Sequence, residues 1–241
     1  MEKQWFETWF DTEEYHQLYK NRDEQEASAF INKLINFLQP DKNATFLDIA
    51  CGKGRHAKQI NDLGFKVVGY DLSKNSIYAA QKLQNEKLSF YTHDMRKLFW
   101  TNYFDYAFNL FTSFGYFDTE LDEKNAMLSA TKALKNNGTL VIDFLNKHKV
   151  IADLIPFEIK NINQIDYHIS KTIQNNQVIK TIQYQKNGQS FEYTEKVKLL
   201  AIEEFENYLQ FAGLKIQHVF GNYDLQEFTP TSSRLIIVAK K

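Results

Sequence analysis

The sequence predicts an α/β protein with a doubly wound, mostly parallel sheet and an inserted antiparallel β meander. Three observations support this fold class. Short apolar runs alternate with helical stretches over the first 145 residues, which is typical of βαβ units. Between 157 and 200 the pattern changes to alternating polar and apolar residues, broken by Asn-containing turn signals. Two further apolar runs near the end of the chain complete the expected sheet.

The elements follow one another in an order that fits this sheet. An aromatic cluster opens the chain, and an amphipathic helix is expected from 26 to 38, ended by Pro40. Strands and helices then alternate, and Asn137-Gly138 is expected to close the helix that precedes the fifth strand. The expected strands are 45–50, 66–70, 88–92, 104–111, 139–144, 215–220 and 234–239, and the helices are 55–63, 73–83, 121–134 and 202–212.

Composition and charge exclude several classes of protein. The chain of 241 residues is 43% hydrophobic and 24% charged, which predicts a folded globular protein. Its net charge of -1 provides no basic field for a phosphate backbone, so nucleic acid is not favoured as a partner. Cys51 is the only cysteine and the histidines lack metal-ligand spacing, so neither a disulfide nor a metal site is expected. Without a signal sequence or a run of ~18 apolar residues, we expect a cytoplasmic protein with no membrane contact.

The most informative segment is a strand that runs into a glycine-bearing turn and opens a helix. Gly52 and Gly54 let the backbone approach a ligand, and the helix start offers free amide hydrogens. The same turn satisfies the dinucleotide-binding pattern G-x-G-x-x-G/A with Gly52, Gly54 and Ala57. Asp71 follows it in the sequence at about the separation at which a ribose-binding acid is expected. Asp48 argues against a dinucleotide, because a carboxylate at this strand end would repel a pyrophosphate and suits a cation.

This segment, FLDIACGKGRH at 46–56, resembles motif I of class I S-adenosylmethionine-dependent methyltransferases, whose ligand carries an ammonium group and a sulfonium. VVGYDLS at 67–73 is similar to the second motif of that family. The resemblance implies that Asp71 accepts both ribose hydroxyls and that Leu72 packs on the adenine. HDMR at 93–96 resembles the segment that reads the adenine edge, through the Asp94 carboxylate and the Met95 amide.

Two further stretches extend the resemblance. The segment 104–116 is similar to strand four and its loop, which face the methionine half of the cofactor and the substrate, and its candidates are Asn109, Phe111 and Tyr116. The stretch YHQLY at 15–19, with Arg22, is similar to the leading helix of small-molecule members such as sugar N-methyltransferases and glycine methyltransferase-like enzymes. The cofactor-binding residues that the resemblance implies are Tyr15, Tyr19, Arg22, Asp48, Ala50, Gly52, Gly54, Arg55, Asp71, Leu72, Asp94, Met95 and Asn109.

The resemblance implies a Rossmann-like fold whose mostly parallel seven-stranded sheet has a reversed last strand. Its domains would be an N-terminal helical lid at 1–40, a cofactor-binding domain at 41–156 and 201–241, and an inserted antiparallel β substrate lid at 157–200. The implied reaction moves a methyl group to a nitrogen or oxygen of a small-molecule acceptor by in-line displacement, in a monomer or homodimer. No catalytic residue is fixed by the sequence, and the candidates are Tyr116, Asp143, Asn146 and His168.

Other functions stay open at this point. One is an NAD(P)-dependent oxidoreductase, which the glycine spacing permits, and another is a protein that binds the cofactor without transferring a methyl group. Methylation of a protein or an RNA is a third. Nucleic-acid amino-methyltransferases of this fold carry Asn or Asp followed by Pro-Pro and an aromatic residue, whereas Asn109 is followed by Leu110-Phe111-Thr112. That subfamily is therefore excluded.

Overall fold

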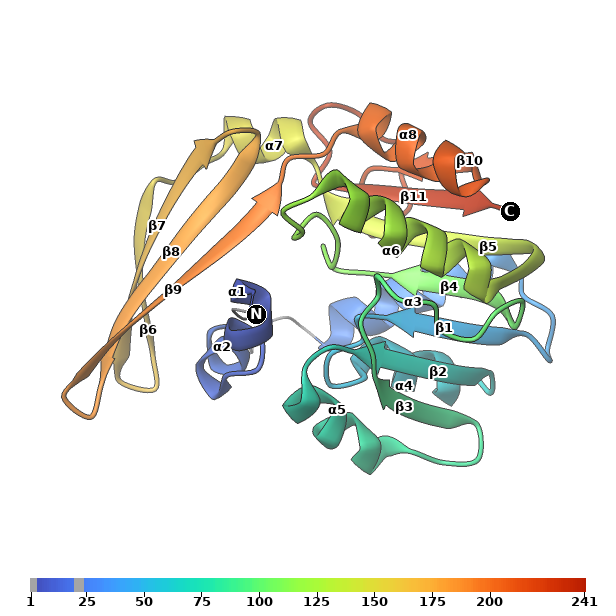
Figure 1. The fold of residues 1–241 in the computed structure, drawn as a ribbon, viewed down its shortest axis with the longest axis horizontal. Helices are drawn as coiled ribbons and strands as arrows, with labels where there is room; N and C mark the ends of the chain where they lie inside the picture. The colour runs from blue at the N-terminus through green and yellow to red at the C-terminus, as the bar shows by residue number, and fades with distance from the viewer. Residues whose placement is uncertain (1–3, 20–23) are drawn as a thin grey trace.

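The computed structural model describes residues 4–19 and 24–241, and the side chains of 24–27 are not described. It contains a seven-stranded sheet and a separate four-stranded sheet, with the N-terminal helices α1 and α2 between them (Figure 1). The strand order of the larger sheet is β10-β11-β5-β4-β1-β2-β3. Its strands are β1 Thr45–Ile49, β2 Lys66–Asp71, β3 Leu88–Thr92, β4 Phe104–Asn109, β5 Leu134–Leu145, β10 Lys215–Phe220 and β11 Arg234–Lys240.

The larger sheet confirms the predicted fold class. Strands β1 to β5 pair in parallel, and β11 runs antiparallel to both of its neighbours, β5 and β10. The reversed strand predicted near the end of the chain is therefore present. The strands nearest the centre are buried on both faces, which explains why their sequences are continuous apolar runs.

Helices cover both faces of this sheet. On one face α6 (Glu120–Ala133) and α8 (Ile202–Ala212) share an apolar core with β4, β5 and β11. On the other face α3 (Glu24–Leu38), α4 (Arg55–Asp62) and α5 (Lys74–Ala80, continued by a 3₁₀ turn at Gln81–Leu83) form the second core with β1, β2 and β3. No helix in the described part of the chain has the length and apolar character needed to cross a bilayer.

One boundary prediction was wrong. Asn137-Gly138 does not close α6, because that helix already ends at Ala133 and Leu134 is extended. The two residues instead lie inside β5, where Asn137 adopts a positive φ of 64° and the register against β4 shifts. The turn signal therefore marks a bulge within a strand.

The segment after β5 forms α7 (Lys147–Ala152) and then the four-stranded antiparallel sheet. Its strands are β6 Phe157–Ile162, β7 Ile165–Gln174, β8 Gln177–Lys186 and β9 Gln189–Lys198, in that spatial order. The predicted turns Asn175-Asn176 and Asn187-Gly188 are confirmed, and all four residues have positive φ. Two such residues give the backbone twist that a two-residue hairpin needs.

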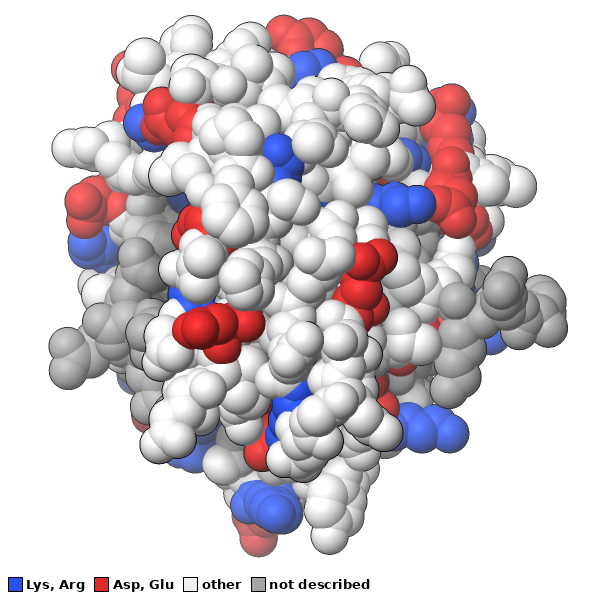
Figure 2. Space-filling view, turned by 90° about the vertical axis from the view of Figure 1, so that its left-hand side faces the viewer, with Lys and Arg blue, Asp and Glu red and all other residues white. Residues whose placement is uncertain are grey.

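The two faces of this sheet differ in what they contact. The inner face buries Tyr167, Ile169, Ile182 and Tyr184 against the N-terminal segment, which comprises α1 (Trp5–Trp9), α2 (Glu13–Leu18) and the turn between them. Charged side chains are sparse over much of the outer face (Figure 2). The sheet thus packs an apolar part of its inner face against the N-terminal segment and leaves its outer face in solvent.

Candidate functional site

Polar side chains meet at the carboxyl edge of the parallel sheet. Asp48 lies near the end of β1, Asp71 ends β2, Asp94 follows β3 and Asn109 ends β4. Because these strands run in parallel and are neighbours, their carboxyl ends meet at one edge. The structure therefore brings together the residues that the sequence motifs single out.

The turn after β1 has an unusual backbone. Ala50, Gly52 and Gly54 have positive φ values of 57°, 54° and 82°. A Cβ added at Gly52 would meet no atom within 4 Å, so this residue borders open space. A Cβ at Gly54 would lie 2.6 Å from the ring of the buried Phe90. The position of Gly52 therefore borders open space, and the absence of a Cβ at Gly54 is also required by the core. The assignment of both glycines to the ligand stays a prediction.

Asp71 ties the first two loops together. Its Oδ2 accepts a hydrogen bond from the Gly52 amide at 2.8 Å, and its Oδ1 accepts one from the Ser73 amide at 2.8 Å. Burial raises the pKa of Asp71, while hydrogen bonds from the Ser73, Gly52 and Leu72 amides oppose the shift. Each carboxylate oxygen has a second lone pair, so the group has the capacity to accept from two hydroxyls as well.

Asp48 is almost fully buried beneath the glycine turn. One carboxylate oxygen accepts from the Ala57 amide at 3.0 Å, at the start of α4. Burial raises its pKa to about 7, Asp71 adds to the shift, and the Ala57 amide and Arg55 oppose it. A nearby ammonium group would favour the ionised carboxylate, so this site suits a cation.

Asn109 has an unpaired acceptor. Its amide nitrogen contacts the carbonyls of Ile49 and Ser113 at 3.4 and 3.5 Å. Its Oδ1 is buried and has no hydrogen-bond partner among the described residues. An unsatisfied buried carbonyl costs free energy, and a donor from a ligand would remove that cost.

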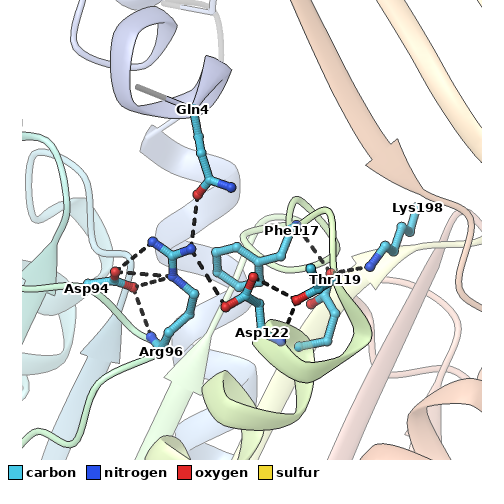
Figure 3. A network of polar contacts seen from close by, with 8 residues as sticks. Gln4, Asp94, Arg96, Phe117, Thr119, Asp122 and Lys198 are labelled. Carbon is cyan, nitrogen blue, oxygen red and sulfur yellow. Dashed lines mark hydrogen bonds and ion pairs between the residues drawn. The ribbon is translucent and has the colours of Figure 1, made fainter. Parts of the chain in front are cut away.

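Asp94 belongs to a network that the sequence did not reveal (Figure 3). Arg96 donates to it from Nε at 3.0 and 3.1 Å and from Nη2 at 2.8 Å, while Arg96 Nη1 donates to Gln4 Oε1 at 3.0 Å. Although burial raises the pKa of Asp94, these bonds outweigh it and hold the pKa below its usual value. The Arg96 guanidinium also lies over the Phe117 ring, 4.9 Å from its centroid.

The N-terminal segment reaches the same edge. Asp11 accepts hydrogen bonds from the Ser73 hydroxyl and from the Asn75 amide, the latter at 3.0 Å, at the start of α5. Sequence analysis gave Asp11 no role, because its partners lie more than 60 residues away in the chain. Through Ser73 the segment is anchored two residues from Asp71.

Comparison with known proteins identifies the family. Residues 40–213 match the family of the methyltransferase domain. The chain belongs to this family. It is 27% identical over 220 residues to YqeM of Bacillus subtilis (strain 168), which carries the name of a methyltransferase, and the match covers 87% of this chain and 88% of YqeM. The enzyme is an S-adenosylmethionine-dependent methyltransferase, and the dinucleotide alternative is not supported.

Solved methyltransferases share the fold over their whole length. An S-adenosylmethionine-dependent methyltransferase from Clostridium acetobutylicum ATCC 824 superimposes with a TM-score of 0.79 at 19% identity, over 93% of this chain and 94% of that one. CalS10, an amino pentose methyltransferase from Micromonospora echinaspora, superimposes with a TM-score of 0.72 at 19% identity, over 95% of this chain and 97% of CalS10. KedS8, a sugar N-methyltransferase from Streptoalloteichus sp ATCC 53650, superimposes with a TM-score of 0.74 at 18% identity, over 94% of this chain and 92% of KedS8.

The remaining predicted cofactor residues of the enzyme lie around this edge or on the N-terminal segment. Leu72 and Met95 pack at the rim of the first apolar core. Arg55 lies over the Phe111 ring, 5.3 Å from its centroid. Tyr15 packs among the aromatic rings of the N-terminal segment, and the Tyr19 hydroxyl donates to Glu195 of β9 at 2.7 Å. Arg22 lies outside the described residues.

The four catalytic candidates fall in different places. Tyr116 packs against Trp5 and Phe10 under the N-terminal segment, and its hydroxyl donates to the Thr112 carbonyl. His168 is exposed on the outer face of the antiparallel sheet, because it alternates with the inward Tyr167. The structure therefore does not bring His168 to the carboxyl edge.

Asp143 and Asn146 are held by structural hydrogen bonds. Asp143 accepts from Arg234 Nε at 2.7 Å, from the Phe111 amide at 2.9 Å and from the Tyr223 hydroxyl at 3.1 Å. Asn146 accepts from the His148 amide at 3.1 Å, which caps α7, and its amide donates to carbonyls of the loop 229–232. Within 4–19 and 24–241, no three His, Cys, Asp or Glu side chains are grouped to hold a metal ion.

Proposed function

We propose that this methyltransferase transfers the methyl group of S-adenosylmethionine to a nitrogen or oxygen of a small-molecule acceptor by in-line displacement. The observation that carries the proposal is the meeting of Asp48, Asp71 and the unpaired Asn109 oxygen at one edge of the sheet, under the N-terminal segment. Similarity in fold to an amino pentose methyltransferase and a sugar N-methyltransferase supports a small acceptor. A cytoplasmic location and a monomeric or homodimeric state stay predictions from the sequence.

The polar groups match the two ends of the cofactor. The two Asp71 oxygens, each with a lone pair to spare, would accept from the ribose hydroxyls. Asp48 and the Asn109 oxygen would accept from the ammonium group of the methionine part, which satisfies a buried carbonyl and stabilises a buried carboxylate. Leu72 would pack on the adenine, and Asp94 together with the Met95 amide would read its edge, with Arg96 fixing the carboxylate.

The N-terminal segment and the antiparallel sheet would form the lid and the wall of the acceptor site. The N-terminal segment is bonded to both sheets: Asp11 contacts α5, and Trp9 Nε1 donates to Glu195 of β9 at 2.7 Å. Domain boundaries at 1–40, 41–156 with 201–241, and 157–200 follow from this division of roles. Such a closed space excludes water from the transfer step.

The chemistry would rest on alignment. A methyl group on a positive sulfur is already activated, so the protein has mainly to hold donor and acceptor in line. Asp143 and Asn146 have their polar atoms engaged in structural bonds, and His168 lies on the outer face. Of the four candidates, Tyr116 is the one that packs beneath the N-terminal segment, where it would position an acceptor. This arrangement favours an amine that binds in its neutral form and needs no strong base.

Isothermal titration with S-adenosylhomocysteine tests the cofactor site without an acceptor. We expect saturable binding by the wild type and a loss of affinity of at least about tenfold in Asp71→Ala, because a charge-assisted hydrogen bond contributes roughly 1.5–3 kcal/mol. Asp62→Ala, which removes an exposed carboxylate on α4, is the matched control and should bind normally. Formation of S-adenosylhomocysteine with a panel of amines, amino sugars and hydroxyl compounds then tests the acceptor class. Absence of binding by the wild type would refute the assigned cofactor site.

A further inference from the structure

A cavity lies between α7 and the inner face of the antiparallel sheet. Its volume is about 370 Å³, within the range of small-molecule sites. Its walls include the apolar side chains Val150, Leu154, Val178 and Val197, and the ammonium-bearing side chains of Lys171 and Lys180 also line it. Helix α7, which forms one wall of the cavity, begins one residue after Asn146 on the carboxyl side of β5 (Figure 1).

The two lysines occupy an unfavourable arrangement. Lys171 on β7 and Lys180 on β8 are directly opposite each other in the strand register, and both point to the inner face. Like charges directly opposite each other destabilise a sheet. Their side chains are only 25% and 15% exposed, so water screens them poorly. Two cations in this position need negative charge from elsewhere.

The carboxylates of the sheet supply only part of that charge. Lys171 pairs with Glu158 at 2.6 Å, and Glu158 also faces Lys160 at 3.5 Å. Lys180 donates to the Tyr19 hydroxyl and lies over that ring, 4.4 Å from its centroid, and its only carboxylate partner among the described residues is Glu195 at 3.5 Å. Glu195 also accepts from Trp9 Nε1 and from the Tyr19 hydroxyl, both at 2.7 Å.

Counting the charged groups that line the cavity leaves an excess of one positive charge. The positive groups are Lys149, Lys171 and Lys180, and the negative groups are Asp153 and Glu195. On the opposite wall, Lys149 and Asp153 of α7 neutralise each other at 2.5 Å. Burial lowers the pKa of Lys180, Glu195 opposes that shift, and Lys171 and Lys160 add to it. A bound anion would offset both the charge excess and the repulsion between the opposed lysines.

We propose that Lys171 and Lys180 bind an anionic group of the methyl acceptor, a carboxylate or a phosphate, whose apolar part packs on the valines of the cavity. This inference rests on the proposed function, because it assigns the cavity to the acceptor. Two ammonium groups on neighbouring strands suit a group with several acceptor oxygens. The acceptor is thus an acidic small molecule, and the cavity selects it by charge.

The test uses thermal unfolding of the full chain with sodium phosphate or sodium acetate, each compared with sodium chloride at equal ionic strength. A ligand that binds only the native state raises the melting temperature. We expect one or both anions to raise it in the wild type, and the rise to be lost in Lys171→Met and Lys180→Met. A response to phosphate alone identifies a phosphorylated acceptor, and a response to acetate alone identifies a carboxylic acid.

Lys196→Met is the matched control, because Lys196 is exposed and its strand partner Ile179 belongs to the outer face of the same sheet. It should keep the wild-type response. Binding of S-adenosylhomocysteine is measured in every variant and should be unchanged, which shows that each is folded and separates this inference from the cofactor site. If Lys180→Met fails to bind that product, Lys171→Met carries the test. Equal melting temperatures in phosphate, acetate and chloride, or a full response in the folded lysine variants, would overturn the inference.

Discussion

The two glycines of the turn after β1 predict different effects for the same substitution, mainly a loss of stability at Gly54 and mainly a loss of cofactor binding at Gly52. Both have positive φ, so an added Cβ costs roughly 1–2 kcal/mol of backbone strain in either Gly52→Ala or Gly54→Ala. At Gly54 the Cβ also meets the Phe90 ring at 2.6 Å. That ring is 2% exposed, and a Cβ at Gly69 would also lie 2.7 Å from it, so the ring is tightly packed against both glycines. Overpacking of this kind adds about 1–3 kcal/mol.

Gly54→Ala should therefore lower the free energy of unfolding by about 2–5 kcal/mol, which is roughly 5–15 °C in melting temperature for a chain of this size. Gly52→Ala should lower it by only about 1–2 kcal/mol, because its Cβ would enter open space. That open space is where we place the cofactor, so Gly52→Ala should weaken binding of S-adenosylhomocysteine by about tenfold or more.

Urea unfolding followed by circular dichroism measures the first effect, and isothermal titration measures the second. Gly188→Ala is the control, since this hairpin glycine has a φ of 77° and open space around its Cβ. It should show the strain cost alone, with normal product binding. Wild-type affinity in Gly52→Ala would show that the open side of the turn does not face the cofactor, and wild-type stability in Gly54→Ala would show that Phe90 yields.

Three further predictions concern the carboxylates of Asp48, Glu123 and Asp11. The pKa of Asp48 is raised to about 7 in the folded state, so between about pH 4 and 7 the folded chain keeps a proton that the unfolded chain has lost. The free energy of unfolding without ligand should therefore fall as pH rises through this range. Urea unfolding at several pH values should show a weaker dependence of this free energy on pH in Asp48→Asn. Glu123 is fully buried and pairs with Lys198 at 3.1 Å, so Lys198→Met should cost about 3–5 kcal/mol in urea unfolding, and the double variant Glu123→Leu with Lys198→Met should recover most of it. Asp11→Ala should speed tryptic release of the N-terminal segment, whereas an unchanged rate would show that Asp11 does not anchor it.

The elements that the sequence predicted well are those whose signal is local. The turns Asn175-Asn176 and Asn187-Gly188 need positive φ, which Asn and Gly tolerate, so their residues alone predicted the hairpins. The helix at 202–212 was predicted to the residue because its apolar spacing ends at Gly213. Asn137-Gly138 carries the same local signal, but pairing of the preceding residues with β4 turns it into a bulge. The pairing of β5 with β4 decides the structure at Asn137-Gly138, and a local sequence pattern carries no information about that pairing.

The same division applies to the candidate site. Asp48, Asp71 and Asn109 were predicted from the resemblance of their segments to family motifs, and the structure brings them together because each stands at or near the end of a parallel strand. The packing of Gly54 against Phe90 was not predicted, because the spacing of glycines does not reveal a ring packed behind one of them. Asp11 escaped notice because its partner Ser73 is 62 residues away in the sequence.

The cavity proposed for the acceptor combines a local pairing with distant contacts. The Asn175-Asn176 turn sets the register that opposes Lys171 and Lys180, whereas Glu195 gains its partners only when the N-terminal segment packs on the sheet. In the sequence, each of these residues is one charge in an alternating strand, where a solvated position is the ordinary expectation. The residues proposed for the cofactor form short motifs because one turn and three strand ends carry them. The cavity proposed for the acceptor is lined by residues of α7, β7, β8 and β9, so its combination of charged and apolar side chains is seen only in the folded structure.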